Sequence, residues 1–385
     1  MTTPARIYLD NAATTPLDPQ VLAAMLPFLE HSFGNPSSTH WHGRQVRSAI
    51  EKARKTVAEL LRCSPSEIVF TSGGTEADNY ALRGAVECFG LRHAISSPTE
   101  HHAVLHTLED LEKAGKVQLS KLQVDAQGRI SLEELKQLLE KNGPAIVSLM
   151  HGNNEIGNLH PIEEIAEICK HYGAYFHSDT VQTMGHYAHD TRSLKADYLV
   201  GAAHKFHGPK GIGFLYMNAK AKVKPCITGG SQERGMRGGT ENVCGIVGLA
   251  KALELAYEDM GGHQQHIGQL KALMIASLQE KISDVRWNGL SGDLAESLYT
   301  VLSVSLPPSD DSDMLLFNLD LKNISASGGS ACSSGSELGS HVLRAIGHEA
   351  GRSAVRFSFS RFNSSEDIRQ AVEALASLYQ EACSK

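Results

Sequence analysis

Hydrophobic and polar positions along the chain follow two periods, one typical of helices and one typical of buried strands. Within residues 42–61 the apolar side chains recur at helical spacing and would share one face: Val46, Ile50, Ala53, Val57 and Leu60. Similar stretches alternate with short apolar runs from about residue 45 to 217. This alternation is typical of crossover units that build a largely parallel sheet, so we predict an α/β fold.

The predicted buried strands of this region are EIVF, HAISS, VQLSKLQV, AIVSLM, AYFHSD and DYLVGA, followed by IGFLYM. Helices are predicted at about residues 101–114, 131–141 and 162–172, and one long helix from about Val243 to Lys281. After it, the strands VRWN, YTVLSVSL and AVRFSF alternate with helices near 337–346 and 364–382. These last elements indicate a smaller mixed domain, which we expect the N-terminal segment to join.

We therefore predict two domains. Residues 16–252 would form the large domain, and residues 1–15 and 253–385 the small domain, with a mobile loop at about 325–336. No internal repeat or low-complexity tract argues for another organisation.

Composition excludes some classes of function. The 385 residues carry a formal net charge of -7, and both signs are scattered along the chain, so no basic surface is expected to attract nucleic acid. No apolar run approaches the roughly 18 residues of a membrane span, and the first residues lack the apolar core of a signal peptide. The sequence therefore predicts a cytoplasmic protein without a membrane segment.

The seven cysteines include no CxxC or CxxH pair, which argues against a disulfide framework or a zinc site. Most of them stand beside apolar or helical stretches, where a thiol usually behaves as a small core side chain. Cys332 differs, because the small, flexible residues of SASGGSACSSGSE surround it. It is the candidate for a reactive thiol on a loop.

The stretch ADYLVGAAHKFHGPKGIGFLY carries the first candidate chemistry, because a buried strand ends in a small-residue turn with His204 and Lys205. Most lysines extend along the surface to water, whereas a Schiff-base lysine must be desolvated to act as a nucleophile. Lys195 and Lys210 are alternatives on spacing, but they lie before the strand and beyond the Gly-Pro turn.

Asp179 ends the strand AYFHSD, 26 residues before Lys205. Ligands of open α/β sheets bind at the carboxyl ends of strands, and pyridoxal chemistry needs a carboxylate that keeps the pyridine nitrogen protonated. An ordinary strand-end aspartate is the alternative interpretation. Gln182, on the same loop, is placed to hydrogen-bond a ring oxygen.

A phosphate site is predicted at TSGGTEADNYALRGA, a Gly-rich turn that leads from a strand into a helix. Backbone N–H groups and the helix dipole favour an anion there, with Gly74 and Thr75 as the candidate residues. His101 begins the next helix, where its imidazole could lie over the cofactor ring.

The motifs YLDNAATTP, FGNPSSTH, TSGGTEADN, TEHHAV, MHGNNEIG, HSDTVQ, AHKFHGPKGIG, QERGMRGGT, SGGSACSSGS and VRFSFSRF together closely resemble the NifS/IscS-type cysteine desulfurases. These enzymes belong to the class V aminotransferase superfamily, which has the pyridoxal phosphate (PLP) fold type I. The resemblance covers nearly the whole chain. It implies a large domain with a mainly parallel sheet flanked by helices and a smaller α+β domain.

The resemblance also implies roles for individual residues. Lys205 would form the Schiff base with PLP, Asp179 would pair with the pyridine nitrogen, and His101 would stack on the ring. The remaining implied cofactor contacts are Gln182, Gly74, Thr75, His204, Asn154 and, from the second subunit of a homodimer, Thr240. Asn35 and Arg356 would hold the carboxylate of L-cysteine, with Asn154 near the substrate. Cys332 would receive the sulfur as a persulfide and pass it to an acceptor protein such as an iron–sulfur scaffold.

Two departures and several alternatives accompany the resemblance. Ala202 replaces a serine that many relatives use to bind the phosphate, and the chain ends at YQEACSK without the long tail that often docks the scaffold. No metal is expected in the active site, although Cys332 is a candidate contact for a cluster on a partner. A selenocysteine lyase, another class V PLP enzyme and a catalytically silent binding protein are the alternative hypotheses.

Overall fold

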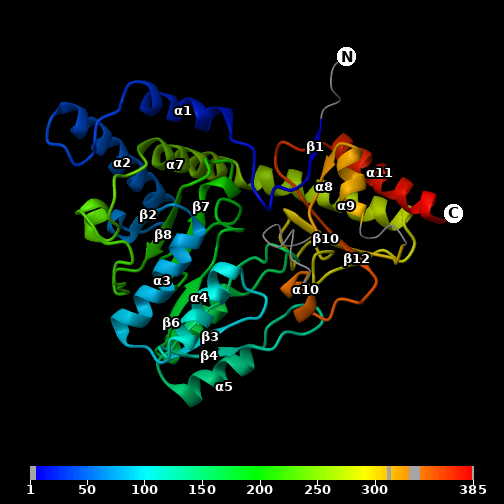
Figure 1. The fold of residues 1–385 in the computed structure, drawn as a ribbon, viewed down its shortest axis with the longest axis horizontal. Coiled ribbons are helices and arrows are strands. Elements are labelled where there is room, and N and C mark those ends of the chain that lie inside the picture. The colour runs from blue at the N-terminus through cyan, green and yellow to red at the C-terminus, as the bar shows by residue number, and fades with distance from the viewer. Residues whose placement is uncertain (1–5, 310–313, 329–338, 384–385) are drawn as a thin grey trace.

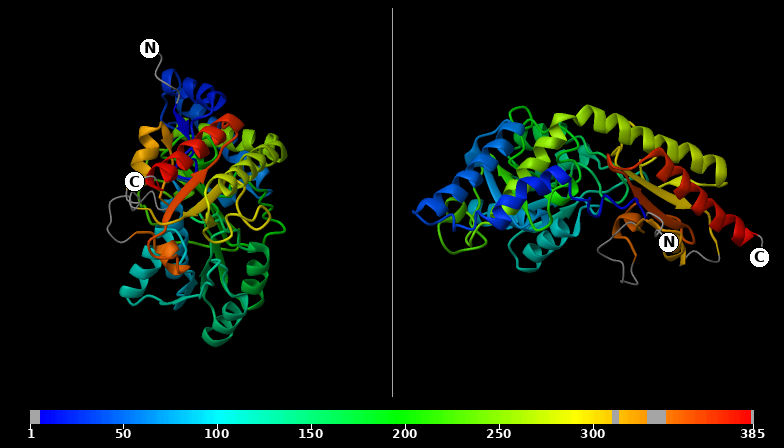
Figure 2. Two further views of the ribbon diagram at one scale, coloured as in Figure 1. Left: turned by 90° about the vertical axis from the view of Figure 1, so that its right-hand side faces the viewer. Right: turned by 90° about the horizontal axis from the view of Figure 1, so that it is seen from above.

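Two lobes lie side by side along the longest axis of the computed structural model (Figure 1). The view from above also separates them, with the N-terminal segment entering near their junction (Figure 2). The structure describes residues 6–309, 314–328 and 339–383. Within these ranges, no helix has both the length and the apolar character that a bilayer span requires.

A seven-stranded sheet with the order β2-β8-β7-β6-β5-β3-β4 forms the centre of the larger lobe. Its strands are β2 (Ile68–Thr71), β3 (His93–Ser96), β4 (Gln118–Lys121), β5 (Ile146–Ser148), β6 (Tyr175–Ser178), β7 (Tyr198–Ala202) and β8 (Gly213–Met217). β8 runs antiparallel to both of its neighbours, β2 and β7, and all other pairs in this sheet are parallel. Each of the seven predicted runs overlaps one of these strands, so the predicted α/β fold is confirmed.

Helices cover both faces of the sheet because the strands are apolar on both sides. On β7, Leu199 packs into one apolar cluster, while Tyr198 and Val200 pack into another on the opposite face. The first cluster includes side chains of α1 (Pro19–Glu30), α2 (Trp41–Leu60), α5 (Leu132–Asn142), α6 (Ile162–His171) and α7 (Val243–Glu258). The second includes α3 (Gly74–Phe89) and α4 (His102–Lys113). The result is a three-layer lobe.

The smaller lobe is built on an antiparallel sheet of β9 (Arg286–Trp287), β10 (Val301–Leu306) and β12 (Ser353–Ser358). α8 (Met260–Lys281) packs against α11 (Ser365–Cys383), and their apolar side chains share a third cluster with the sheet. The shorter elements are α9 (Leu315–Leu321), α10 (His341–Ala345) and the parallel pair β1 (Ile7–Tyr8) and β11 (Ile324–Ser325). Through β1 the N-terminal segment contributes to this lobe; the predicted domain boundaries at 15/16 and 252/253 stay predictions.

The prediction of one helix from Val243 to Lys281 is wrong. The chain leaves helical geometry at Asp259, where φ is -134° and ψ is 42°, and α8 begins at the next residue. Aspartate competes with the helical backbone for hydrogen bonds, and the following Gly261 and Gly262 favour helix poorly. The apolar pattern continues across Asp259, so it does not indicate the break between α7 and α8.

Candidate active site

A cavity of about 260 Å³ opens at the edge of the large sheet where the parallel strands end. Most of the predicted site residues line it: Gly74, Thr75, His101, Asn154, Asp179, Gln182, His204, Lys205 and Arg356. These residues follow the carboxyl ends of β2, β3, β5, β6 and β7, except Arg356, which comes from β12 of the smaller lobe. The convergence follows from the parallel sheet, because it brings the ends of all its parallel strands to one edge.

Lys205 occupies a short 3-10 turn that directly follows β7. Its Nζ donates hydrogen bonds to the carbonyls of Ala12 (2.5 Å) and Ala13 (3.0 Å), so the N-terminal segment closes one side of the cavity. Burial, together with Lys205 and Lys210, lowers the pKa of His204 to about 4. His204 therefore enters the site as a neutral imidazole.

The start of α3, where the Gly-rich turn predicts an anion site, has no side-chain cap. The N-cap position is Gly73, which has no side chain to occupy the first N–H groups of the helix. A Cβ atom added at Gly74 would lie 2.8 Å from Cγ2 of Val181, so only glycine lets the backbone approach this closely. Ala202, also at the cavity wall, supplies no hydroxyl group to this site.

The floor of the cavity carries Asp179 and Gln182. Oδ1 of Asp179 accepts a hydrogen bond from the backbone N–H of Val181 (2.9 Å), and Nε2 of Gln182 donates to the Ala12 carbonyl (3.0 Å). His101 caps α4 by accepting from the N–H of Ala103 (3.1 Å). Burial lowers the pKa of His101, and Lys205 adds to this effect, while Asp179 opposes it.

Arg356 is fully buried, with 1% of its surface exposed. One terminal nitrogen donates to the carbonyl of Asn154 (2.8 Å) and the other to Oδ1 of Asp10 (2.7 Å). Its Nε has no hydrogen-bond partner among the described residues. A buried guanidinium with an unused donor is suited to bind a carboxylate.

Cys332 lies outside the described residues, in the segment 329–338, so its role stays a prediction. Described residues on either side of this segment contact or line the cavity wall. Ser327 exchanges backbone hydrogen bonds with Arg356 (2.6 and 3.2 Å). His341 lines the cavity and donates from Nε2 to the carbonyl of Glu100 (2.9 Å).

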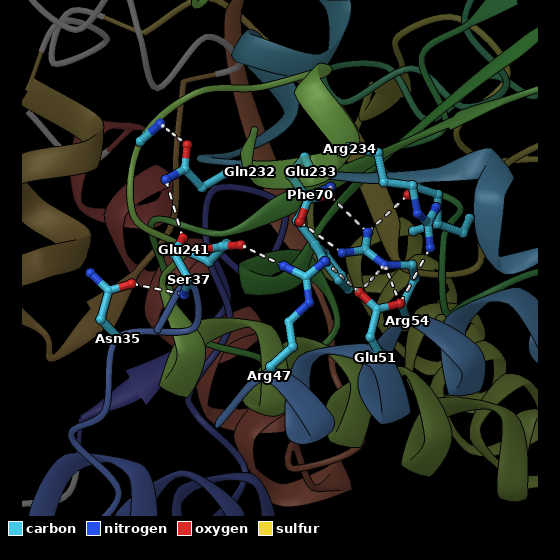
Figure 3. A network of polar contacts seen from close by, with 12 residues as sticks. Asn35, Ser37, Arg47, Glu51, Arg54, Phe70, Gln232, Glu233, Arg234 and Glu241 are labelled. Carbon is cyan, nitrogen blue, oxygen red and sulfur yellow. Dashed lines mark hydrogen bonds and ion pairs between the residues drawn. The ribbon is translucent and has the colours of Figure 1, made fainter. Parts of the chain in front are cut away.

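Asn35 and Thr240 do not line this cavity, although both were predicted to act in the site. Thr240 lines a separate cavity of about 240 Å³, and Asn35 lies on the surface. Figure 3 shows that the two segments are connected, because Gln232 contacts Ser37 (3.5 Å) and accepts from the N–H of Gly239 (3.3 Å). Asn35 in turn accepts from the N–H of Ser37 (2.9 Å).

A buried ion pair fixes the segment that leads to Thr240 (Figure 3). Arg54 of α2 donates to both carboxylate oxygens of Glu233 at 2.7 and 2.8 Å, and both side chains are almost fully buried. Glu233 also accepts from the N–H of Phe70 in β2 (2.9 Å). The segment is thereby attached to β2, the strand that leads into α3.

Sequence reasoning missed several residues of the cavity, namely Asp78, His102, Glu155 and His341. Asp78 and Glu155 stand within the quoted motifs TSGGTEADN and MHGNNEIG, but nothing in the hydrophobic pattern indicates that these acids are buried. Their positions become apparent only when the sheet and its covering helices are assembled.

Known proteins share this architecture. The family description "Aminotransferase class-V" matches residues 7–371. A relative named cysteine desulfurase IscS, from Dictyoglomus turgidum, is 43% identical over 373 residues, which cover 96% of this chain and 93% of the relative. A solved NifS-like protein superposes with a TM-score of 0.90 at 36% identity, covering 98% of this chain and 100% of its own. A second solved structure, named SspA in complex with cysteine, has a TM-score of 0.78 at 31% identity, covering 93% and 99%.

The chain therefore belongs to the aminotransferase class-V family. Within that family it is a member of the NifS/IscS type of cysteine desulfurases, as the sequence motifs predicted.

Proposed function

We propose that the protein is a PLP-dependent cysteine desulfurase that converts L-cysteine to L-alanine and holds the sulfur as a persulfide on Cys332. The observation that carries the proposal is the single cavity into which Lys205, Asp179, His101 and Arg356 converge from both lobes. The relatives named cysteine desulfurase support the choice of reaction.

The residues of the cavity fit PLP. The open N–H groups at Gly74 and the neutral His204 suit its phosphate, the Asp179 carboxylate suits its pyridine nitrogen, and the Lys205 amine suits its aldehyde. When bound, PLP supplies an electron sink for bonds at the substrate Cα. Thr75, Gln182 and Asn154 are the further proposed contacts of the cofactor.

Arg356 is proposed to bind the substrate carboxylate through its unused Nε–H and the adjacent terminal nitrogen. Asp10 and Asn154 hold the guanidinium plane at 2.7 and 2.8 Å, so the donors are already oriented before substrate arrives. The exposed Asn35 is proposed to assist, although this chain alone does not bring it to the cavity.

The chain's own groups then move protons and sulfur. Lys205 is proposed to take the Cα proton, and the neutral His101 assists this transfer. The Cys332 thiolate attacks the substrate sulfur, so that an S–S bond forms while the bond between Cβ and sulfur breaks. The electron pair of the broken bond stays with the carbon skeleton, which is protonated and leaves as alanine.

A homodimer is proposed as the working form, with Thr240 of one subunit reaching the cofactor phosphate of the other. The surface placement of Asn35 and Thr240, linked through Gln232, supports this proposal. The outer side of α1 supports it too, since Leu22, Leu26 and Leu29 are 44%, 39% and 58% exposed.

A sulfur-acceptor protein such as an iron–sulfur scaffold is the proposed partner. The cytoplasmic location and the absence of nucleic-acid binding stay predictions from composition.

The test is release of alanine and sulfide from L-cysteine under reductant, for the wild type and Cys332→Ala, together with their visible spectra. We expect the variant to keep the visible band of bound PLP and to lose sulfur release. Full activity in Cys332→Ala would contradict the role of this thiol. If kcat/KM for selenocysteine greatly exceeds that for cysteine, the selenocysteine lyase alternative replaces the proposal.

A further inference from the structure

A histidine outside the cavity connects the reactive lysine to the smaller lobe. His186 stands in the segment that follows β6, shortly after Gln182, and the proposed reaction gives it no role. Nε2 of its ring lies 3.1 Å from the carbonyl oxygen of Lys205, and Nδ1 lies 3.0 Å from the hydroxyl oxygen of Tyr299. One imidazole thus bridges the main chain of Lys205 and a side chain of the other lobe.

The smaller lobe holds His186 at a second point as well. Its backbone carbonyl accepts a hydrogen bond from Nε2 of Gln264 in α8 (2.8 Å), and the Tyr299 hydroxyl lies 3.2 Å from the same oxygen. Tyr299 is buried just before β10, the strand that pairs with β12. Because β12 carries Arg356, the contacts of His186 lead from Lys205 to the strand pair that holds this arginine.

The hydrogen-bonding partners define the tautomer of His186. The Lys205 carbonyl can only accept, so Nε2 carries the hydrogen and donates. Burial lowers the pKa of His186 to about 4 against the effect of this hydrogen bond, and His263 and Arg361 lower it further. The ring is therefore neutral near pH 7, and its Nδ1 accepts from the Tyr299 hydroxyl. That second bond fixes which nitrogen faces Lys205.

Close packing fixes the approach of this segment to the lysine. Gly185 has a φ of 77°, in the left-handed region, and a Cβ atom added there would lie 2.8 Å from Cβ of Phe206. Only glycine therefore lets the segment come this near to the residue after Lys205. The preceding carbonyl, that of His204, accepts from both the N–H and the hydroxyl of Thr15 (2.9 Å each). Two successive carbonyls of the lysine turn are thus held by other segments.

We propose that His186 is a positioning residue for Lys205, which holds the main chain of the lysine and connects it through Tyr299 to the lobe that carries Arg356. The inference rests on the proposed function, in which Lys205 takes a proton from a substrate whose carboxylate Arg356 binds. The amine and the guanidinium come from different lobes, so their relative position depends on contacts between the lobes. A misplacement of about 1 Å can cost up to ~100-fold in rate, which makes such a contact important for proton transfer.

The experiment compares His186→Gln and His186→Asn as purified holoenzymes. The glutamine amide reaches the place of Nε2 and can donate to the Lys205 carbonyl, whereas the shorter asparagine amide reaches only the place of Nδ1. The readout is exchange of the Cα hydrogen of L-alanine, the proposed product, for solvent deuterium, followed by NMR. The exchange rate is divided by the amount of bound PLP, taken from its visible band. This normalised rate reports proton transfer by Lys205 without sulfur chemistry.

We expect His186→Asn to lower the normalised rate ~10-fold and His186→Gln to keep it within about threefold of wild type. The KM for cysteine should change less than about threefold in both variants, because Arg356 is untouched. A loss of folded protein lowers exchange and bound PLP together, so a purely structural role leaves the normalised rate unchanged. A wild-type rate in His186→Asn, or equal losses in both variants, would overturn the proposal.

Tyr299→Phe tests the connection to the smaller lobe, and it is the second variant if His186→Asn does not fold. The phenyl ring keeps the volume but loses the hydroxyl that orients His186, so we expect the normalised rate to fall ~3-fold or more. A rate equal to that of the wild type would overturn this connection.

His348→Asn is the matched control. His348 lies in the smaller lobe, contacts the Arg352 carbonyl (3.1 Å) and the Asn288 side chain (2.8 Å), and does not line the cavity. Its substitution should leave the normalised rate unchanged. Failure of the proposed function is seen separately, as a wild type that exchanges alanine but leaves cysteine unconverted. In that case the exchange rates of the His186 variants still decide whether His186 positions Lys205.

Discussion

Lys271 is a buried base that should destabilise the fold at neutral pH. It lies on α8 with no exposed surface, and its Nζ donates to Oγ of Ser297 (2.7 Å) and to the carbonyl of Leu298 (2.8 Å). Burial lowers its pKa from 10.5 to about 7, although Asp293 acts in the opposite direction. The unfolded chain therefore binds a proton at pH 8 that the folded chain mostly lacks.

The size of this effect follows from linkage. A difference of one pH unit between folded and unfolded pKa values is worth ~1.4 kcal/mol, so the folded state loses about 5 kcal/mol at pH 7 and below. The loss shrinks as pH rises from about 7 to 10.5, because deprotonation of the unfolded chain removes it. Wild-type stability should therefore gain up to ~1.4 kcal/mol per pH unit from this residue within that window.

Lys271→Met removes the titrating group while keeping an unbranched side chain. We expect the free energy of unfolding of the variant, minus that of the wild type, to be largest at pH 7 and to fall by about 2 kcal/mol by pH 9. Urea unfolding at fixed chain and PLP concentrations measures this difference, because ligand and subunit concentrations also shift stability. Lys281→Met, on the same helix but partly exposed, is the control and should give a flat difference. A flat difference for Lys271→Met as well would refute the reasoning.

Two further predictions concern buried arginines. Arg54→Met should lower the free energy of unfolding, measured by urea unfolding, by about 3–5 kcal/mol, because it leaves the Glu233 carboxylate buried without its partner. The double variant Arg54→Met, Glu233→Leu should recover most of this loss, and no recovery would contradict the ion-pair explanation. Arg356→Lys should raise the KM for cysteine ~10-fold or more without loss of the visible band of bound PLP, because an ammonium group cannot replace a planar guanidinium held by Asp10 and Asn154. An unchanged KM in steady-state kinetics would count against binding of the substrate carboxylate by Arg356.

Much of the fold and of the candidate site could be predicted because a single physical rule links them. Buried parallel strands are continuous apolar runs, and their carboxyl ends meet at one edge of the sheet. Asp179 and Lys205 each follow such a run, so the sequence placed both at that edge, and the cavity contains both. The Gly-rich turn at Gly74 could be interpreted in the same way, since the uncapped start of a helix after a strand favours an anion.

The residues that could not be predicted depend on tertiary burial. Asp78 stands in the first turns of α3, where acids are usually exposed and favoured by the helix dipole. Its burial results from α3 lying on His177 and Asp179, and no periodic pattern within α3 contains that information. The burial of Arg54 could not be predicted either, because its partner Glu233 is distant in sequence. The helix break at Asp259 was missed for a local reason, since the apolar period continues across it.

The crowding of acids on the cavity floor links cofactor binding to folding under the proposed function. Glu100 is fully buried, accepts one backbone hydrogen bond from Met150 (2.7 Å), and has a second oxygen without a partner among the described residues. Together with Asp78 it leaves Asp179 in a region where further negative charge is costly. A pyridinium nitrogen at Asp179 would add the missing positive charge, so the free energy spent in assembling this floor is recovered when PLP binds.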